Sequence, residues 1–79
     1  MWRSWVKKYG IRQLAEALGI SYESVRRWAL GITRPEGKNL HNLVHLAFRS
    51  LSPDDFMEFL ESLGEDILGI KVRPHAVNE

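Results

Sequence analysis

Residues 11–31 read IRQLAEALGISYESVRRWALG, and this stretch decides the fold. Its apolar residues recur with helical period, except at Gly19-Ile20-Ser21, where the pattern is broken once before it resumes. The pattern therefore predicts two short helices, at residues 11–18 and 22–30, joined by a tight turn. Gly19 supplies the left-handed residue that such a turn needs. Ser21 is the expected cap of the second helix, worth about 1 kcal/mol.

The two predicted helices have one apolar side and one polar side. The side chains expected in the core are Leu14, Ala15, Leu18, Ile20, Val25 and Trp28. The side chains expected on the outward side are Arg12, Gln13, Tyr22, Glu23, Arg26 and Arg27. A pair of helices whose second member is basic and rich in hydrogen-bonding groups is typical of a helix-turn-helix unit.

Composition places this unit in a single small domain. The chain has 79 residues, of which 44% are hydrophobic and 27% are charged, as expected for a compact folded core. It contains no cysteine, which excludes disulfides, zinc-thiolate sites and thiol nucleophiles. No apolar run approaches the roughly 20 residues of a membrane span, and no signal segment opens the chain. We therefore expect a cytoplasmic protein without membrane contact.

Charge is divided unevenly along the chain. Residues 1–49 hold nine Lys or Arg against three Asp or Glu, a net charge of +6. Residues 50–79 hold two Lys or Arg against seven Asp or Glu, a net charge of −5. Such asymmetry indicates that the basic end meets a polyanion and the acidic end stays away from it.

The flanking sequence predicts three more helices around the central pair. Trp2, Trp5, Val6 and Tyr9 form one stripe of a helix at residues 2–9, with Arg3, Lys7 and Lys8 turned to solvent. A loop at residues 32–38 leads to a helix at residues 40–51, capped by Asn39 and apolar over more than half its circumference. His41 and His45 have a spacing that suits a metal ligand pair, but without Cys or nearby acidic residues we expect no metal site.

The last predicted helix spans residues 53–63. Ser52, Pro53 and two carboxylates mark its start, and Gly64 is its expected end. Phe56, Phe59, Leu60 and Leu63 should face inward. Residues 1–64 would then form an all-α, compact five-helix domain, with the helix-turn-helix at residues 11–31. Residues 65–79 would be a C-terminal tail, in which residues 67–72 suit a short strand, a further helical turn or a dimerisation arm.

With these residues laid out, the chain resembles the phage repressor and Cro type of helix-turn-helix, the XRE-like regulators. The matching positions are Leu14, Ala15, Leu18, Gly19, Ile20, Ser21, Val25, Trp28, Gly31, Pro35, Leu43, Leu46 and Ala47. Three features depart from the family pattern. Ile11 replaces a frequent phosphate-binding Gln, the first helix is short, and Glu36-Gly37-Lys38 lengthens the loop.

The resemblance implies that the helix at residues 22–30 lies in the major groove of double-stranded DNA. The side chains expected at base edges are Tyr22, Glu23 and, as the first choice, Arg27; Arg26 is expected at a base or a phosphate. The same resemblance implies a nucleoid-associated protein. Those expected at the DNA backbone are Ser21, Ser24, Arg12, Gln13, Thr33, Arg34 and Lys38. No catalytic residue, cofactor or metal is expected, since no nucleophile is paired with a base and no phosphate loop is present.

Three functions agree with these features. The first is a sequence-specific transcriptional regulator, a repressor acting as a homodimer through its last two helices or its tail. The second is a DNA-binding accessory factor for excision, replication, partition or antitoxin activity, which shares the fold. The third is a protein-interaction module that uses its last two helices.

Overall fold

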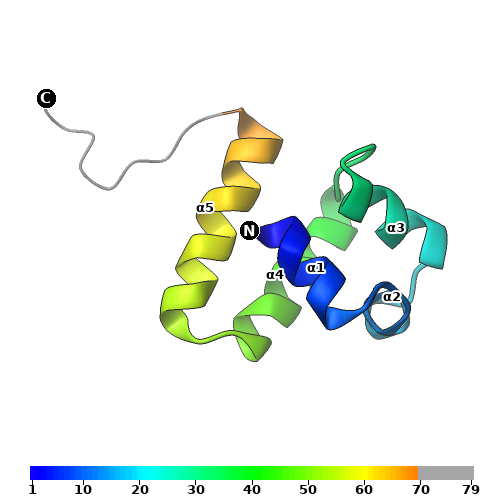
Figure 1. Cartoon of the computed structure of the whole chain (residues 1–79), viewed down its shortest axis with the longest axis horizontal. Coiled ribbons are helices and arrows are strands. Elements are labelled where there is room, and N and C mark those ends of the chain that lie inside the picture. Colours follow the sequence, from blue (N-terminus) through cyan, green and yellow to red (C-terminus); the bar gives the residue numbers. More distant parts are fainter. Residues whose placement is uncertain (70–79) are drawn as a thin grey trace, which may run out of the picture.

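A computed structural model describes residues 1–69 and folds them into five helices (Figure 1). The helices are α1 (Trp2–Tyr9), α2 (Ile11–Leu18), α3 (Tyr22–Leu30), α4 (Gly37–Ser50) and α5 (Pro53–Leu68). The predicted all-α, five-helix fold is thus confirmed, and the bounds predicted for the first three helices are correct. No helix within residues 1–69 combines the length and the apolar composition that a membrane crossing requires.

One core, to which all five helices contribute, holds the molecule together. Helix α1 lies in the middle, with α5 on one side and the α2–α3 pair on the other (Figure 1). The buried hydrophobic side chains are Trp2, Trp5, Val6, Leu14, Ala15, Val25, Trp28, Ala29, Leu43, Ala47, Phe59 and Leu63. Pro35 is also fully buried, so the segment between α3 and α4 is anchored to the domain. The expected core positions Leu18 and Ile20 are partly buried and pack against this cluster.

The fourth helix begins earlier than the sequence predicted. It starts at Gly37 and ends at Ser50, not at Leu40 and Leu51, and Asn39 is not its cap. The carbonyl oxygen of Glu36 accepts the N–H of Asn39 at 3.1 Å, and no side chain caps the helix. Gly37 has a φ of 55°, a conformation that glycine adopts at little cost. The chain therefore turns into α4 through a glycine, and the loop predicted at residues 32–38 ends at Glu36.

The fifth helix continues beyond its predicted end. Ser52 caps its start as expected, with its hydroxyl accepting the N–H of Asp55 at 3.2 Å. The predicted end near Gly64 is wrong, because the helix extends to Leu68 and ends at Gly69, whose φ is 69°. The expected boundary between residues 64 and 65 thus falls inside α5. For residues 67–72 the sequence allowed a short strand, a further helical turn or an arm. Residues 67 and 68 are helical, and residues 70–72 lie outside the described residues.

The last two turns of α5 bind the start of α1. Asp66 accepts a hydrogen bond from the indole Nε1 of Trp2 at 2.5 Å, and Ser62 Oγ accepts the backbone N–H of Trp2 at 3.2 Å. Arg3 pairs with Asp66 and donates from Nε to the carbonyl oxygen of Trp28 at 3.0 Å. The expectation that Arg3 faces solvent is therefore wrong. We call Trp2, Arg3, Ser62 and Asp66 the α1–α5 clasp, which also contacts the end of α3.

Candidate nucleic-acid interface

The turn between α2 and α3 has the geometry that the sequence predicted. Gly19 is left-handed, with φ 69° and ψ 33°, and Ile20 donates its N–H to the carbonyl oxygen of Ala15 at 3.0 Å. Ser21 then caps α3, since its Oγ accepts the N–H of Ser24 at 3.1 Å. The two hydroxyl oxygens lie 2.9 Å apart. These contacts fix the direction in which α3 leaves the turn.

Burial divides α3 into an inner and an outer face. Val25, Trp28 and Ala29 face the core, which leaves Tyr22, Glu23, Arg26 and Arg27 on the outer side. Tyr22 is 48% exposed, and the side chain of Arg27 is 52% exposed. Four of the sequence-predicted site residues thus share one accessible helical face, as a groove-reading helix requires.

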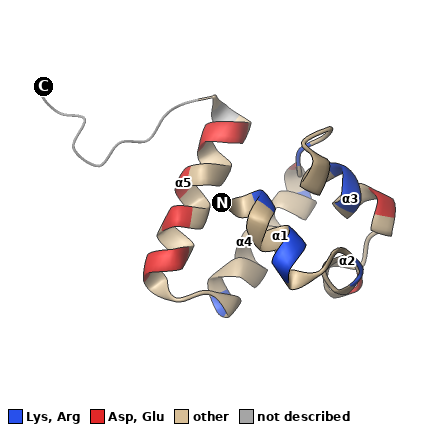
Figure 2. Ribbon diagram, in the orientation of Figure 1, with Lys and Arg blue, Asp and Glu red and all other residues tan. Residues whose placement is uncertain are grey.

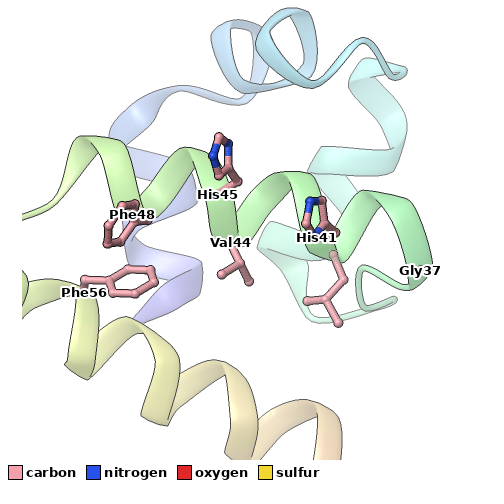
Figure 3. A pocket seen from close by; sticks show the side chains of 7 residues that line it. Gly37, His41, Val44, His45, Phe48 and Phe56 are labelled. Atoms are coloured by element: carbon pink, nitrogen blue, oxygen red, sulfur yellow. The ribbon is translucent and has the colours of Figure 1, made fainter.

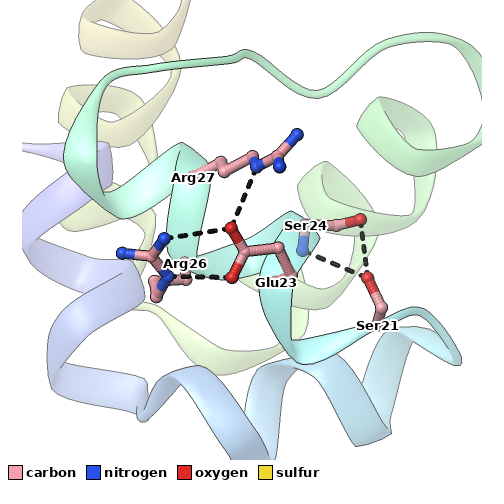
Figure 4. Close-up of polar contacts among 5 residues, drawn as sticks. All are labelled: Ser21, Glu23, Ser24, Arg26 and Arg27. Atoms are coloured by element: carbon pink, nitrogen blue, oxygen red, sulfur yellow. Dashed lines mark hydrogen bonds and ion pairs between the residues drawn. The ribbon is translucent and has the colours of Figure 1, made fainter.

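Glu23 joins both arginines of this face (Figure 4). Arg26 donates from Nε and Nη2 to the two carboxylate oxygens of Glu23 at 2.9 and 3.0 Å, and Arg27 donates from Nε at 3.0 Å. Hydrogen bonds from Arg26 and Arg27 lower the pKa of Glu23 from 4.5 to about 2. From the sequence, each of these three residues was expected to contact DNA separately. Their spacing of three and four residues on one helix was the signal for pairing.

The start of α2 adds one basic side chain to the outer face. The guanidinium of Arg12 lies over the ring of Tyr22, 5.8 Å from its centroid, and both line a hollow with Glu16 and Ile20. Gln13, which was predicted to contact the DNA backbone, is exposed at the start of α2. Its side-chain amide occupies the space that a Cβ at Gly10 would take, so it lies over the α1–α2 junction.

The segment after α3 forms the opposite border. An open hollow is lined by Arg27, Ser24, Thr33 and Arg34, so four predicted site residues come together here. Glu36 lines the same hollow, an acidic neighbour that the sequence analysis did not consider. Lys38 is exposed and belongs to the first turn of α4 rather than to the loop, and it is not among the lining residues.

Most acidic residues of the described molecule lie on α5, and its Lys and Arg residues lie outside α5 (Figure 2). Helix α5 contains six acidic and no basic residues between Pro53 and Leu68. Helix α3 has Arg26 and Arg27, and further basic residues lie on α1 and α2. The separation expected from the sequence is therefore present in space. It would orient the molecule with α3 toward a polyanion and α5 away from it.

A second surface of different character lies on α4 (Figure 3). An open apolar hollow is lined by Gly37, Leu40, His41, Val44, His45, Phe48 and Phe56. Phe48 is 62% exposed, although its ring packs edge-on against Phe56 at 5.3 Å. The rings of His41 and His45 are parallel and 6.4 Å apart. Within residues 1–69, no three His, Cys, Asp or Glu side chains converge as a metal site would need.

A second apolar hollow adjoins the first along α5. It shares Leu40 and Val44 with it and is otherwise lined by Leu60, Leu63, Gly64 and Ile67. Among the residues that the structure describes, no Lys, Arg, Asp or Glu lines either hollow. The apolar excess that the sequence predicted for residues 40–51 is therefore exposed along the α4–α5 surface rather than used entirely in the core.

Comparisons of the chain with protein-family models, with curated proteins and with solved structures gave no match. The chemistry of the α3 face is therefore argued from its own side chains.

Proposed function

We propose that the chain is a sequence-specific double-stranded DNA-binding transcriptional regulator that inserts α3 in the major groove. The observation that carries this proposal is the outer face of α3, where Tyr22, Glu23, Arg26 and Arg27 are all accessible. Arginine and glutamate side chains on such a helix match the donors and acceptors that base edges display in the major groove.

The surroundings of α3 support the same function. Arg12 lies at one border of the α3 face and Thr33 with Arg34 at the other. In the proposed complex these side chains would contact phosphates on either side of the groove. The acidic α5 lies away from this face, so it would not repel the DNA backbone. Occupying an operator in this way would make the protein a repressor.

A homodimer is part of the proposal. One short helix reads too few base pairs for useful specificity, and a two-fold dimer doubles the site. The apolar α4–α5 surface, which includes the exposed Phe48, supplies a face that a second copy would cover. Accessory roles in excision, replication, partition or toxin neutralisation use the same DNA contacts, so they remain alternatives within this proposal.

The test is selection of bound sequences from a random DNA pool, followed by gel-shift titration. We expect a two-fold consensus, and at least about a tenfold loss of affinity as salt rises from about 50 to about 200 mM. The double variant Arg26→Ala/Arg27→Ala should lose both the consensus and part of the salt dependence. Unchanged binding by this variant would remove α3 from the interface.

The α4–α5 surface supports one function of another class. A protein-interaction module would bind its partner there, through Phe48 and the neighbouring apolar side chains. A protein of this class would have no salt-sensitive affinity for DNA. Its partner binding should be abolished by Phe48→Asp and left intact by Arg26→Ala/Arg27→Ala.

A further inference from the structure

The two adjacent arginines of α3 are held in different ways (Figure 4). Arg26 directs the fork formed by Nε and Nη2 at the Glu23 carboxylate, with distances of 2.9 and 3.0 Å. Arg27 uses Nε alone, at 3.0 Å, so the hydrogen bonds of Glu23 leave both its terminal nitrogens free. One carboxylate oxygen, Oε2, accepts from both arginines. The three residues thus form a chain from Arg26 through Glu23 to Arg27.

This arrangement separates the roles of the two side chains. A guanidinium has five N–H donors, and a guanine is recognised by two parallel N–H groups that reach O6 and N7. Arg27 keeps four of its five donors, at the end of the side chain. Arg26 spends two donors on Glu23, and its charge is already compensated by a bidentate partner. Arg27 is therefore the better equipped of the two to read a base.

We propose that Arg27 reads one guanine in each half-site, and that Glu23 and Arg26 are positioning residues that fix its orientation. This inference rests on the proposed function and names the base that α3 recognises. Anchoring Nε removes rotational freedom from the Arg27 side chain before DNA arrives, so less entropy is lost on binding. Arg26 acts through Glu23 by holding the carboxylate against the helix.

The test uses the sequence selected by the unmodified protein and a panel in which each base pair is replaced in turn. Arg27→Lys should reduce discrimination at one G·C pair of each half-site by about tenfold or more and leave the other positions unchanged. Arg26→Gln and Glu23→Gln should weaken discrimination at that same pair. At that pair, the double variant Arg26→Gln/Arg27→Lys should lose no more discrimination than Arg27→Lys alone, because both residues act on the same base contact.

Arg34→Gln is the matched control for Arg26→Gln, since each removes one positive charge from the proposed interface. It should lower affinity similarly for all panel members. Far-UV circular dichroism checks that each variant keeps its helices, and Arg27→Gln serves as a second variant at the reading position.

Different results would overturn the proposed function and the assignment of Arg27. If the unmodified protein selects no sequence and shows no salt-sensitive DNA affinity, the proposed function is wrong. If it selects a sequence but Arg27→Lys leaves every base preference unchanged, the assignment of Arg27 is wrong. If Arg26→Gln alters preference at a different base pair, Arg26 is itself a reader and the positioning role is overturned.

Discussion

Replacing Asp66 with alanine tests whether the α1–α5 clasp stabilises the fold. Trp2 is fully buried, and its indole N–H donates to Asp66. Without that acceptor the buried donor is left unpaired, at a cost of about 1–3 kcal/mol. The ion pair with Arg3 adds at most about 1 kcal/mol, because the two side chains are 28% and 34% exposed. We therefore expect Asp66→Ala to lower the free energy of unfolding by about 2 kcal/mol, roughly 30-fold in the equilibrium constant.

The assay is urea and thermal unfolding followed by circular dichroism and tryptophan fluorescence. A loss of about 2 kcal/mol should lower the melting temperature by roughly 10 °C in a domain of this size. Asp66→Asn retains an oxygen acceptor for Trp2 and should cost about 1 kcal/mol or less. Glu65→Ala, an exposed neighbour on the same helix, should change stability by about 0.5 kcal/mol or less. The reasoning is refuted if Asp66→Ala lowers the free energy of unfolding no more than Glu65→Ala does. It is also refuted if Asp66→Asn lowers this free energy as much as Asp66→Ala.

Three further predictions concern glycines, a cap and a carboxylate. Gly64→Ala should stabilise the protein by about 0.5–1 kcal/mol, because Gly64 is inside α5 with no atom within 4 Å of an added Cβ. Gly31→Ala should instead destabilise it by about 1–2 kcal/mol, because the φ there is 78°; equal effects in thermal melts would contradict both. Ser21→Ala should cost about 1 kcal/mol in the same melts, and Ser21→Gly only a few tenths. NMR titration of the Glu23 carboxylate should give a pKa of about 2, rising toward 4.5 in Arg26→Gln/Arg27→Gln. Because the folded-state pKa is lowered, the contribution of these ion pairs to stability is complete above about pH 4.5 and is lost as the pH falls toward 2; an unchanged titration in the double variant would contradict the pairing.

The first three helices were predictable because local signals agree with packing there. Ser21 caps α3 and Gly19 turns the chain, and both act within a few residues of their own position. The sequence also predicted which side of α3 would be accessible, since Val25 and Trp28 mark the buried side. Short-range chemistry therefore accounts for the scaffold of the candidate interface.

The two larger errors in the predicted helix bounds fall at glycines. Gly37 opens α4 rather than preceding it, and Gly64 lies inside α5 rather than ending it. In α5 the turns around Gly64 contact Trp2, about 60 residues away, and these contacts offset the unfavourable helix propensity of glycine, about 1 kcal/mol. No local pattern contains that information.

Within the candidate interface, the sequence predicted which side chains of α3 are accessible, but the hydrogen bonds among them were not predicted. Glu23, Arg26 and Arg27 were predicted as three independent DNA contacts, whereas they hydrogen-bond to one another. Gln13 was expected at the DNA backbone, in place of the phosphate-binding Gln that Ile11 replaces, and its side-chain amide lies over Gly10.

The clasp also bears on the order in which the domain can assemble during synthesis. Helix α1 leaves the ribosome before the other four helices, but the Ser62 and Asp66 groups that bind Trp2 are 60 and 64 residues further along the chain. Until they emerge, the indole N–H of Trp2 lacks its partner, and the apolar side of α1 lacks the cover of α5. A nascent chain that ended before Ser62 would therefore expose part of the future core, and α1 would reach its final packing only when translation of the described domain was almost complete.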